Sequence, residues 1–178
     1  MSPGLYREHG TWVEAPSLQR HDARVALTFH VPSHPGSTGE AVSRRMRALK
    51  RRDNDGELSV RRLLHAAGYR YRVHYPVPDR PRRTIDVAFT RAKVAVFIDG
   101  CFWHGCPEHG TAPTSNGAWW AAKLAANQAR DADTTVALRC QGWHVIRAWE
   151  HEEPAEVGAR VIECLRRLAL GHESLNGA

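Results

Sequence analysis

The alternation of apolar and polar residues predicts regular structure over most of the chain from Asp55 onward. GELSVRRLLHAAG predicts a helix with Asp55 as its N-cap and Gly68 just past its end, because its apolar residues share one helical stripe. The residues on this stripe are Leu58, Leu63, Leu64 and Ala67. The next segment, YRYRVHYPV, alternates apolar and cationic residues with a period of two, which predicts a strand with one solvated face.

Further along the chain, TIDVAF and KVAVFID predict a β-hairpin, since only the residues TRA separate them. The second of these strands is apolar enough to be buried on both faces. An Ala-rich segment that ends at Gly142 then predicts a long helix, WHVIRAW a strand, and PAEVGARVIECLRRLAL a closing amphipathic helix with Pro154 in its first turn. This order of elements predicts an α/β fold in which helices flank a mixed central sheet.

The two ends of the chain lack sustained periodicity. Residues 1–38 mix Pro, Gly, Ser and His, and they predict an N-terminal arm that is partly disordered and packs little. We therefore expect one folded domain over residues 39–172 and a flexible tail over residues 173–178. The sequence contains no apolar run long enough for a signal peptide or a membrane helix, so we expect a cytoplasmic protein with no membrane partner.

The chain has a net positive charge. Lys and Arg outnumber Asp and Glu by 25 to 19 in the 178 residues, and RRMRALKRR and RPRRTIDVAFTRAK concentrate the excess. Such runs favour a polyanionic partner such as nucleic acid, although solvated helix faces and loops also carry them. In a reducing compartment, the four cysteines indicate metal ligands or core residues before disulfides.

Acidic residues at the predicted hairpin suggest a divalent-cation site. Asp86 lies in a strand of otherwise apolar residues, where an ionised carboxylate is costly unless a partner compensates it. Asp99 ends the adjacent strand, and Glu57 lies near the start of the preceding helix. Carboxylates that meet in this way hold Mg²⁺ through their oxygens and water. In the competing interpretation, Asp86 pairs with a nearby arginine and Asp99 caps a turn.

A helix glutamate, a strand aspartate and a second acid on the next strand form the pattern of the PD-(D/E)xK nuclease core. The lysine of that motif is missing here, because Gly100 and Cys101 follow Asp99. His104 could instead take the proton of an attacking water. It could also be a zinc ligand or a surface histidine.

The stretch CFWHGCPEH gathers candidate zinc ligands. Three of them have chelate spacing: Cys101, Cys106 and His109. His151, which follows the WHVIRAW strand, is a better fourth ligand than Cys140 or Cys164, which lie in helical apolar patterns. Four protein ligands would leave no open coordination position, so the zinc would be structural. The alternative is a pair of core cysteines that binds no metal.

These residues also carry a family resemblance. VAVFIDGCFWHGCPEHGTAP, followed by WWAAKLAANQARDADT and GWHVIRAWEHE, resembles the very short patch repair (Vsr) mismatch endonucleases over residues 44–151. That family has a restriction-endonuclease-like fold with structural Zn²⁺, uses Mg²⁺ in catalysis, and nicks duplex DNA beside T:G mismatches left by deamination of 5-methylcytosine. The resemblance implies a monomeric, Mg-dependent DNA endonuclease with mismatch-repair proteins as further partners, located at the nucleoid when bound to DNA.

The resemblance also implies roles for individual residues. Asp86 would be the metal-binding catalytic aspartate, Glu57 the acidic helix residue and His104 the catalytic histidine. The zinc positions would be Cys101, Cys106, His109 and His151. The aromatic residues that intercalate beside the mismatch would be Phe102, Trp103 and Trp120. Further DNA contacts would come from Met46 and Arg47 in an N-terminal segment, and from Lys123 and Asn127 on a helix that faces the mismatched bases.

The chain departs from the family pattern at two places. Ile98 and Asp99 stand where the best-known members have Thr-His, so Ile98 would offer Mg²⁺ its backbone carbonyl, and Asp99 would be a metal ligand or a proton-transfer group. The zinc set has Cys, His and His where that pattern has His, Cys and Cys. Two other functions stay open: a restriction-type DNA endonuclease with another target, and a zinc-stabilised DNA-binding module that does not cleave.

Overall fold

The computed structural model describes residues 5–8, 11–14, 31–36, 44, 54–110, 113 and 115–176. Its central feature is a four-stranded sheet in the order β3-β4-β5-β6. The strands are β3 (Arg72–Val77), β4 (Arg80–Phe89), β5 (Val94–Asp99) and β6 (His144–Trp149). β3, β4 and β5 are antiparallel neighbours, whereas β6 runs parallel to β5. The predicted hairpin and the mixed sheet are therefore confirmed.

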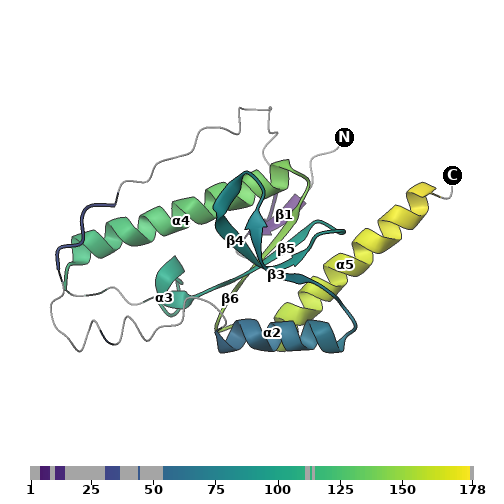
Figure 1. The fold of residues 1–178 in the computed structure, drawn as a ribbon, viewed down its shortest axis with the longest axis horizontal. Helices are drawn as coiled ribbons and strands as arrows, with labels where there is room; N and C mark the ends of the chain where they lie inside the picture. Colours follow the sequence, from purple (N-terminus) through teal and green to yellow (C-terminus); the bar gives the residue numbers. More distant parts are fainter. Residues whose placement is uncertain are drawn as a thin grey trace.

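Helices cover both faces of this sheet (Figure 1). They are α2 (Asp55–Ala66), the short α3 (Cys101–His104), α4 (Gly117–Cys140) and α5 (Pro154–Asn176). One core packs α2 and α5 against the sheet, and a second core packs the C-terminal part of α4 against the opposite face. The predicted helix-flanked architecture is confirmed, and α5 continues past residue 172, where the sequence had suggested the end of the domain.

β5 connects the two cores. All six of its residues are buried, as its apolar sequence predicts. Val94, Val96 and Ile98 point toward α2 and α5, while Ala95 and Phe97 point toward α4. This alternation follows from the period of two in a strand, and each fully buried valine contributes roughly 1.5–3 kcal/mol of hydrophobic stabilisation.

The start of α2 differs by one residue from the prediction. Asn54, and not Asp55, is the N-cap, because its extended backbone lets its side chain accept a hydrogen bond from the Glu57 backbone N–H at 2.7 Å. Asp55 lies in the first turn instead. Gly68 has φ +87°, so it follows the helix in the left-handed conformation expected after a helix end.

Part of the predicted N-terminal arm has regular structure or packs on the domain. β1 (Leu5–Glu8) and β2 (Thr11–Glu14) pair as an antiparallel hairpin. Trp119 of α4 donates a hydrogen bond to the Pro32 carbonyl at 2.8 Å, so the described segment 31–36 lies against the start of α4. Among the described helices, none is long and apolar enough to cross a membrane.

Candidate active site and metal centre

A cleft of about 370 Å³ opens beside the C-terminal end of β5. It is lined by carboxylates, a histidine and several cations that come from both sides of the sheet edge. They are Glu57 of α2, Arg83 and Asp86 of β4, Asp99 of β5, His104 of α3, Lys123, Asn127, Arg130 and Asp131 of α4, and Arg147 of β6. Ile98 and Trp103 also line the cleft. The structure thus brings together most of the residues that the sequence suggested for catalysis.

Asp86 is a largely buried acid with no salt bridge in the described part of the chain. One of its oxygens accepts a hydrogen bond from the Ile98 backbone N–H at 2.9 Å. Burial raises the pKa of Asp86 to about 7; the Ile98 hydrogen bond opposes this rise, and the nearby charges of Glu57 and Asp99 add to it. The alternative of a salt bridge from Arg82, Arg83 or Arg91 is not seen among the described residues: Arg83 pairs with Asp133, and the arginine whose charge lowers the pKa of Asp86 is Arg61. Such a carboxylate is well suited to bind a cation.

Glu57 lies beside Asp86, but an arginine already contacts it. Its side chain is buried, and its carboxylate accepts a hydrogen bond from Arg61, one helical turn further along α2. The Arg61 guanidinium also lies 3.5 Å from His74 Nε2 and 3.4 Å from the Asp86 carbonyl. Ligand atoms of Glu57, His74 and Asp86 lie within 4.8 Å of one another, so this group could also hold a cation.

His74 was not singled out by the sequence, because it resembles an ordinary residue of an alternating strand. Its neighbours Val73 and Tyr75 pair with Val87 and Ile85, which places His74 opposite Asp86. Its φ of +48° is uncommon for a residue other than glycine. Backbone strain of this kind is found most often at functional sites.

Asp99 does not cap a turn. Arg147 donates hydrogen bonds to both of its oxygens, from Nε at 2.7 Å and from Nη2 at 2.5 Å. His104 Nδ1 lies 3.6 Å from Asp99 and only 2.5 Å from Asp131 Oδ2. Burial alone would lower the pKa of His104, but the hydrogen bond with Asp131 and the charges of Asp99 and Asp131 outweigh it, so the pKa is raised.

Asp131 and Arg147 are site residues that the sequence reasoning missed. Asp131 follows Lys123 and Asn127 at intervals of four along α4, so all three share one helix face. Arg147 is the cation within the otherwise apolar centre of HVIRAW. The spacing along α4 and the lone cation in β6 can both be seen in the sequence, but neither pattern shows which residue Asp131 or Arg147 contacts.

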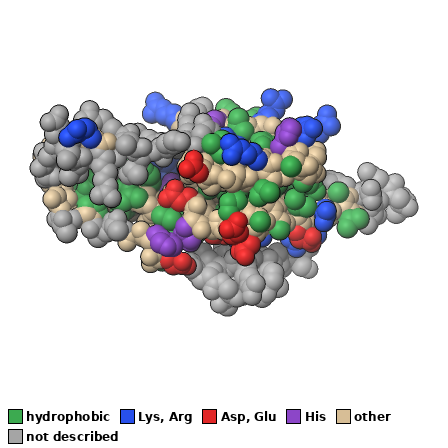
Figure 2. Space-filling model, turned by 90° about the horizontal axis from the view of Figure 1, so that it is seen from below, with side chains coloured by type: hydrophobic (Ala, Val, Ile, Leu, Met, Phe, Trp, Pro, Cys, Tyr) green, Lys and Arg blue, Asp and Glu red, His purple; other side chains and the backbone are tan. Residues whose placement is uncertain are grey.

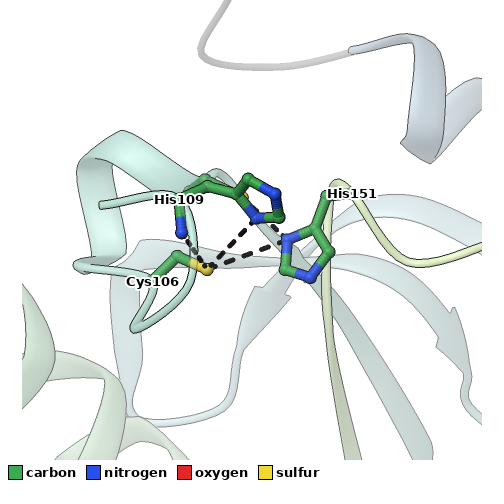
Figure 3. A group of neighbouring side chains, drawn as sticks. Cys106, His109 and His151 are labelled. Atoms are coloured by element: carbon green, nitrogen blue, oxygen red, sulfur yellow. Dashed lines mark hydrogen bonds between the residues drawn. The ribbon is translucent and has the colours of Figure 1, made fainter. Parts of the chain in front are cut away.

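The four predicted zinc ligands form one cluster. Ligand atoms of Cys101, Cys106, His109 and His151 lie within 4.8 Å of one another. Cys101 Sγ is 3.0 Å from His151 Nδ1. Cys106 Sγ is 3.7 Å from the same nitrogen and 3.9 Å from His109 Nδ1, as Figure 3 shows for these three residues. Two thiols and two imidazoles are a donor set that suits tetrahedral Zn²⁺.

The cysteines of this cluster are buried and its histidines are exposed. Figure 2 shows histidine and acidic side chains gathered next to one another on the face seen from below in Figure 1. Cys140 and Cys164 do not belong to the described cluster: Cys140 is exposed on α4, and Cys164 is half-buried on α5. The choice of His151 over these two cysteines therefore agrees with the geometry.

α3 carries the predicted wedge residues between the first two members of this cluster. Phe102 lies 5.1 Å from both Trp103 and Trp120, measured between ring centroids, and all three are half-buried. Asn127 donates a hydrogen bond to the Trp103 carbonyl at 2.8 Å, so α4 holds the backbone of α3. Gly105, with φ +67°, ends α3.

The remaining predicted DNA contacts divide into two groups. Lys123 and Asn127 line the cleft, although the Asn127 amide is already committed to Trp103. Met46 and Arg47 lie outside the described residues. Trp119 and Trp120 are both half-buried, because segment 31–36 and α3 cover the two rings only partly.

Comparison with known proteins agrees with this site. The family model described as DNA mismatch endonuclease Vsr matches residues 37–109. The type II nicking enzyme V.NaeI of Lentzea aerocolonigenes is 40% identical over 157 residues, which cover 87% of this chain and 92% of that protein. V.XorIIP of Xanthomonas oryzae is 37% identical over 60% of this chain and 77% of its own length. The DNA mismatch endonuclease Vsr of Escherichia coli is 31% identical over 61% of this chain and 68% of its own length. The chain therefore belongs to the Vsr family of DNA endonucleases.

Proposed function

We propose that this endonuclease nicks one strand of duplex DNA beside a T:G mismatch, by Mg²⁺-dependent hydrolysis of a phosphodiester bond. The observation that carries the proposal is Asp86, a carboxylate with a pKa raised to about 7 at the wall of a cleft that also holds a histidine and basic residues. Carboxylate oxygens are the ligands that Mg²⁺ prefers. The cations Arg83, Lys123 and Arg130 line the same cleft, where they suit the phosphates of DNA.

The residues of the cleft suit distinct tasks. Asp86 and the Ile98 backbone carbonyl would hold Mg²⁺, which when bound would activate water and stabilise the charge that develops on the phosphate. His104 would accept the proton of the attacking water. Lys123 and Arg130 would position the phosphate backbone.

A structural zinc would fix the position of α3 relative to β6. Cys101, Cys106 and His109 belong to one loop, and His151 follows β6, so a zinc bound by all four would join the two segments. Phe102 and Trp103 lie inside this loop and would be held out as a rigid wedge. The zinc would therefore hold both the wedge and His104, the proposed proton acceptor, in position.

The aromatic cluster supports a mismatched substrate. Phe102, Trp103 and Trp120 together offer ring surfaces on which bases can stack. Insertion of a wedge costs a few kcal/mol per unstacked base step, and the cost is least at a mismatch. Stacking on an aromatic side chain returns about 1–3 kcal/mol per base. The balance favours a T:G wobble pair over a Watson–Crick pair.

The test is a single-turnover nicking assay on three duplexes that differ only in one pair: T:G, T:A or C:G. We expect the T strand of the T:G duplex to be nicked on the order of a hundredfold faster, because a few kcal/mol of unstacking cost separates the substrates. Equal rates on all three duplexes would instead indicate a restriction-type endonuclease. Binding without nicking at any Mg²⁺ concentration would indicate a DNA-binding module.

A further inference from the structure

We propose that residues 31–36, here called the strap, hold the start of α4 so that Trp119 positions Trp120, the ring that completes the aromatic cluster of α3. The inference rests on the proposed function, because this cluster is the part of the protein that would enter the DNA. The strap lies beside the start of α4 (Figure 1), where Trp119 Nε1 donates a hydrogen bond to the Pro32 carbonyl at 2.8 Å. Trp119 also contacts Trp120, so it is a positioning residue between the strap and the cluster.

Two further contacts fasten the strap to α4. The His34 ring packs edge-on against Trp119, with ring centroids 4.5 Å apart and an angle of 73° between the ring planes. The Asn116 side chain donates a hydrogen bond to the Gly36 carbonyl at 3.3 Å. Within the strap, the Gly36 backbone N–H donates to His34 Nδ1 at 3.1 Å, which fixes the orientation of the imidazole. The strap is therefore attached to α4 through Pro32, His34 and Gly36.

Asn116 connects the strap to the backbone of Trp120. It is the N-cap residue of α4, a position at which asparagine normally uses its side chain to accept a hydrogen bond from the helix. Its backbone is left-handed, with φ +58°, and its side chain makes no such cap bond. The side chain instead donates to Gly36, while the Asn116 carbonyl accepts a hydrogen bond from the Trp120 backbone N–H at 3.0 Å. One residue thus holds both the strap and the backbone of Trp120.

Ring contacts extend this restraint to α3. The Trp119 and Trp120 centroids are 4.9 Å apart with ring planes at 81°, and the Trp120 and Phe102 centroids are 5.1 Å apart with planes at 72°. Edge-to-face pairs of this kind favour one relative orientation of the two rings. Phe102 and Trp103 lie in the loop of the Cys/His cluster, but Trp120 lies on α4 outside that loop. A metal in the cluster would not restrain Trp120, whereas the strap would.

The strap should matter for selectivity more than for DNA binding in general. A side chain that is fixed before binding loses less conformational entropy when a base stacks on it, an advantage of about two- to tenfold in rate or affinity. This advantage applies to a duplex in which a base step opens and stacks on the cluster. It does not apply to a matched duplex whose bases stay stacked. Loss of the strap contacts should therefore lower the preference for a T:G duplex.

The first test measures single-turnover nicking of T:G and T:A duplexes by Trp119→Phe and by His34→Ala. Trp119→Phe keeps an aromatic ring but removes the donor to Pro32, and His34→Ala removes the ring that packs on Trp119. We expect each variant to lower the ratio of the T:G rate to the T:A rate about two- to tenfold, through a slower T:G reaction. The double variant should lose no more than the sum of both single losses, because the two substitutions act on the same strap.

Two matched controls make the same substitutions away from the strap. Trp143→Phe changes a buried tryptophan of the second core, beyond the C-terminal end of α4, and His65→Ala changes an exposed histidine on α2. Both should keep the wild-type ratio of T:G to T:A rates. An unchanged ratio in Trp119→Phe and His34→Ala would overturn the inference. Equal slowing on both duplexes would also overturn it, because a residue that only stabilises the fold has this effect.

The second test needs no catalysis and no DNA. Fluorine NMR of protein labelled with 5-fluorotryptophan, with the Trp120 line assigned through Trp120→Phe, reports the surroundings of that ring. We expect His34→Ala to shift or broaden the Trp120 line and His65→Ala to leave it unchanged. A Trp120 line that His34→Ala does not alter would refute the role of the strap, even if selectivity had fallen. A wild-type protein that nicks no duplex would count against the proposed function itself, and the Trp120 line would still decide whether the strap positions that ring.

Discussion

If the Asp86 carboxylate serves to bind a cation, replacing Asp86 with a neutral residue should stabilise the protein in the absence of divalent cations. Asp86→Asn keeps the size of the side chain and an oxygen that can accept the Ile98 N–H, but it removes the buried charge. The pKa of Asp86 is about 7 in the folded chain against 3.8 for an unperturbed aspartate. A difference of about three pKa units corresponds to about 4 kcal/mol at pH 8, an upper bound because the fold can relax around the charge.

The sign of the pH dependence follows from this raised pKa. Below about pH 4 Asp86 is protonated in both the folded and the unfolded chain, so it has no effect on stability. As the pH rises from about 4 to 7, the unfolded chain releases the proton while the folded chain keeps it, so the free energy of unfolding of the wild type falls. Above about pH 7 Asp86 is ionised in both states, and the full destabilisation by its buried charge is present. The advantage of Asp86→Asn should therefore be absent near pH 3, close to 1.5 kcal/mol near pH 5 and largest near pH 8, as order-of-magnitude values.

Urea unfolding in the presence of a chelator, followed from pH 3 to pH 9, measures this difference directly. Addition of Mg²⁺ should then stabilise the wild type and not the variant, because the ion binds the folded carboxylate. Asp133→Asn is the control: it removes a charge that pairs with Arg83 and Arg80, so it should destabilise the protein at neutral pH. Destabilisation by Asp86→Asn, or a benefit that does not vary with pH, would refute the view of Asp86 as an uncompensated acid.

Two further predictions concern the metal cluster and the wedge. Cys101→Ser should lose bound zinc, measured by elemental analysis, and should unfold more readily than the wild type. Cys140→Ser changes an exposed thiol outside the cluster, so it should keep the zinc and the stability of the wild type. A zinc-free wild-type protein of full stability would contradict this prediction. Trp103→Ala should slow nicking of a T:G duplex much more than it weakens binding to matched DNA. Single-turnover rates measure the first effect and a binding titration measures the second. Equal effects on both would show that Trp103 has no special role in mismatch recognition.

Local patterns account for what the sequence predicted well. β5 could be assigned because its residues are apolar up to Asp99, and the grouping of Cys101, Cys106 and His109 because they are close in sequence. His151 was identified because a residue just after a strand lies at a predictable edge of the sheet. These inferences depend on periods and short spacings, which a single sequence displays.

The partners of buried charges could not be predicted in this way. Arg147 pairs with Asp99, and His104 with Asp131, only because α4 and β6 lie on either side of the end of β5. The choice of Asn54 over Asp55 as N-cap is a different case, since both residue types cap helices and the backbone conformation decides between them.

The parallel pairing of β6 with β5 has a consequence for the order in which the enzyme becomes active during synthesis. The Glu150 backbone N–H bonds to the Asp99 carbonyl, and the Glu150 side chain accepts from the Cys101 N–H at 2.7 Å. Arg147 lies in β6 and His151 just after it, so this short segment completes both the group around His104 and the Cys/His group. A chain that emerges from the ribosome in order, at about 5–20 residues per second, has already exposed Asp86 and His104 when neither cluster can close. We therefore expect that the nascent chain can assemble neither cluster until β6 and His151 have been made.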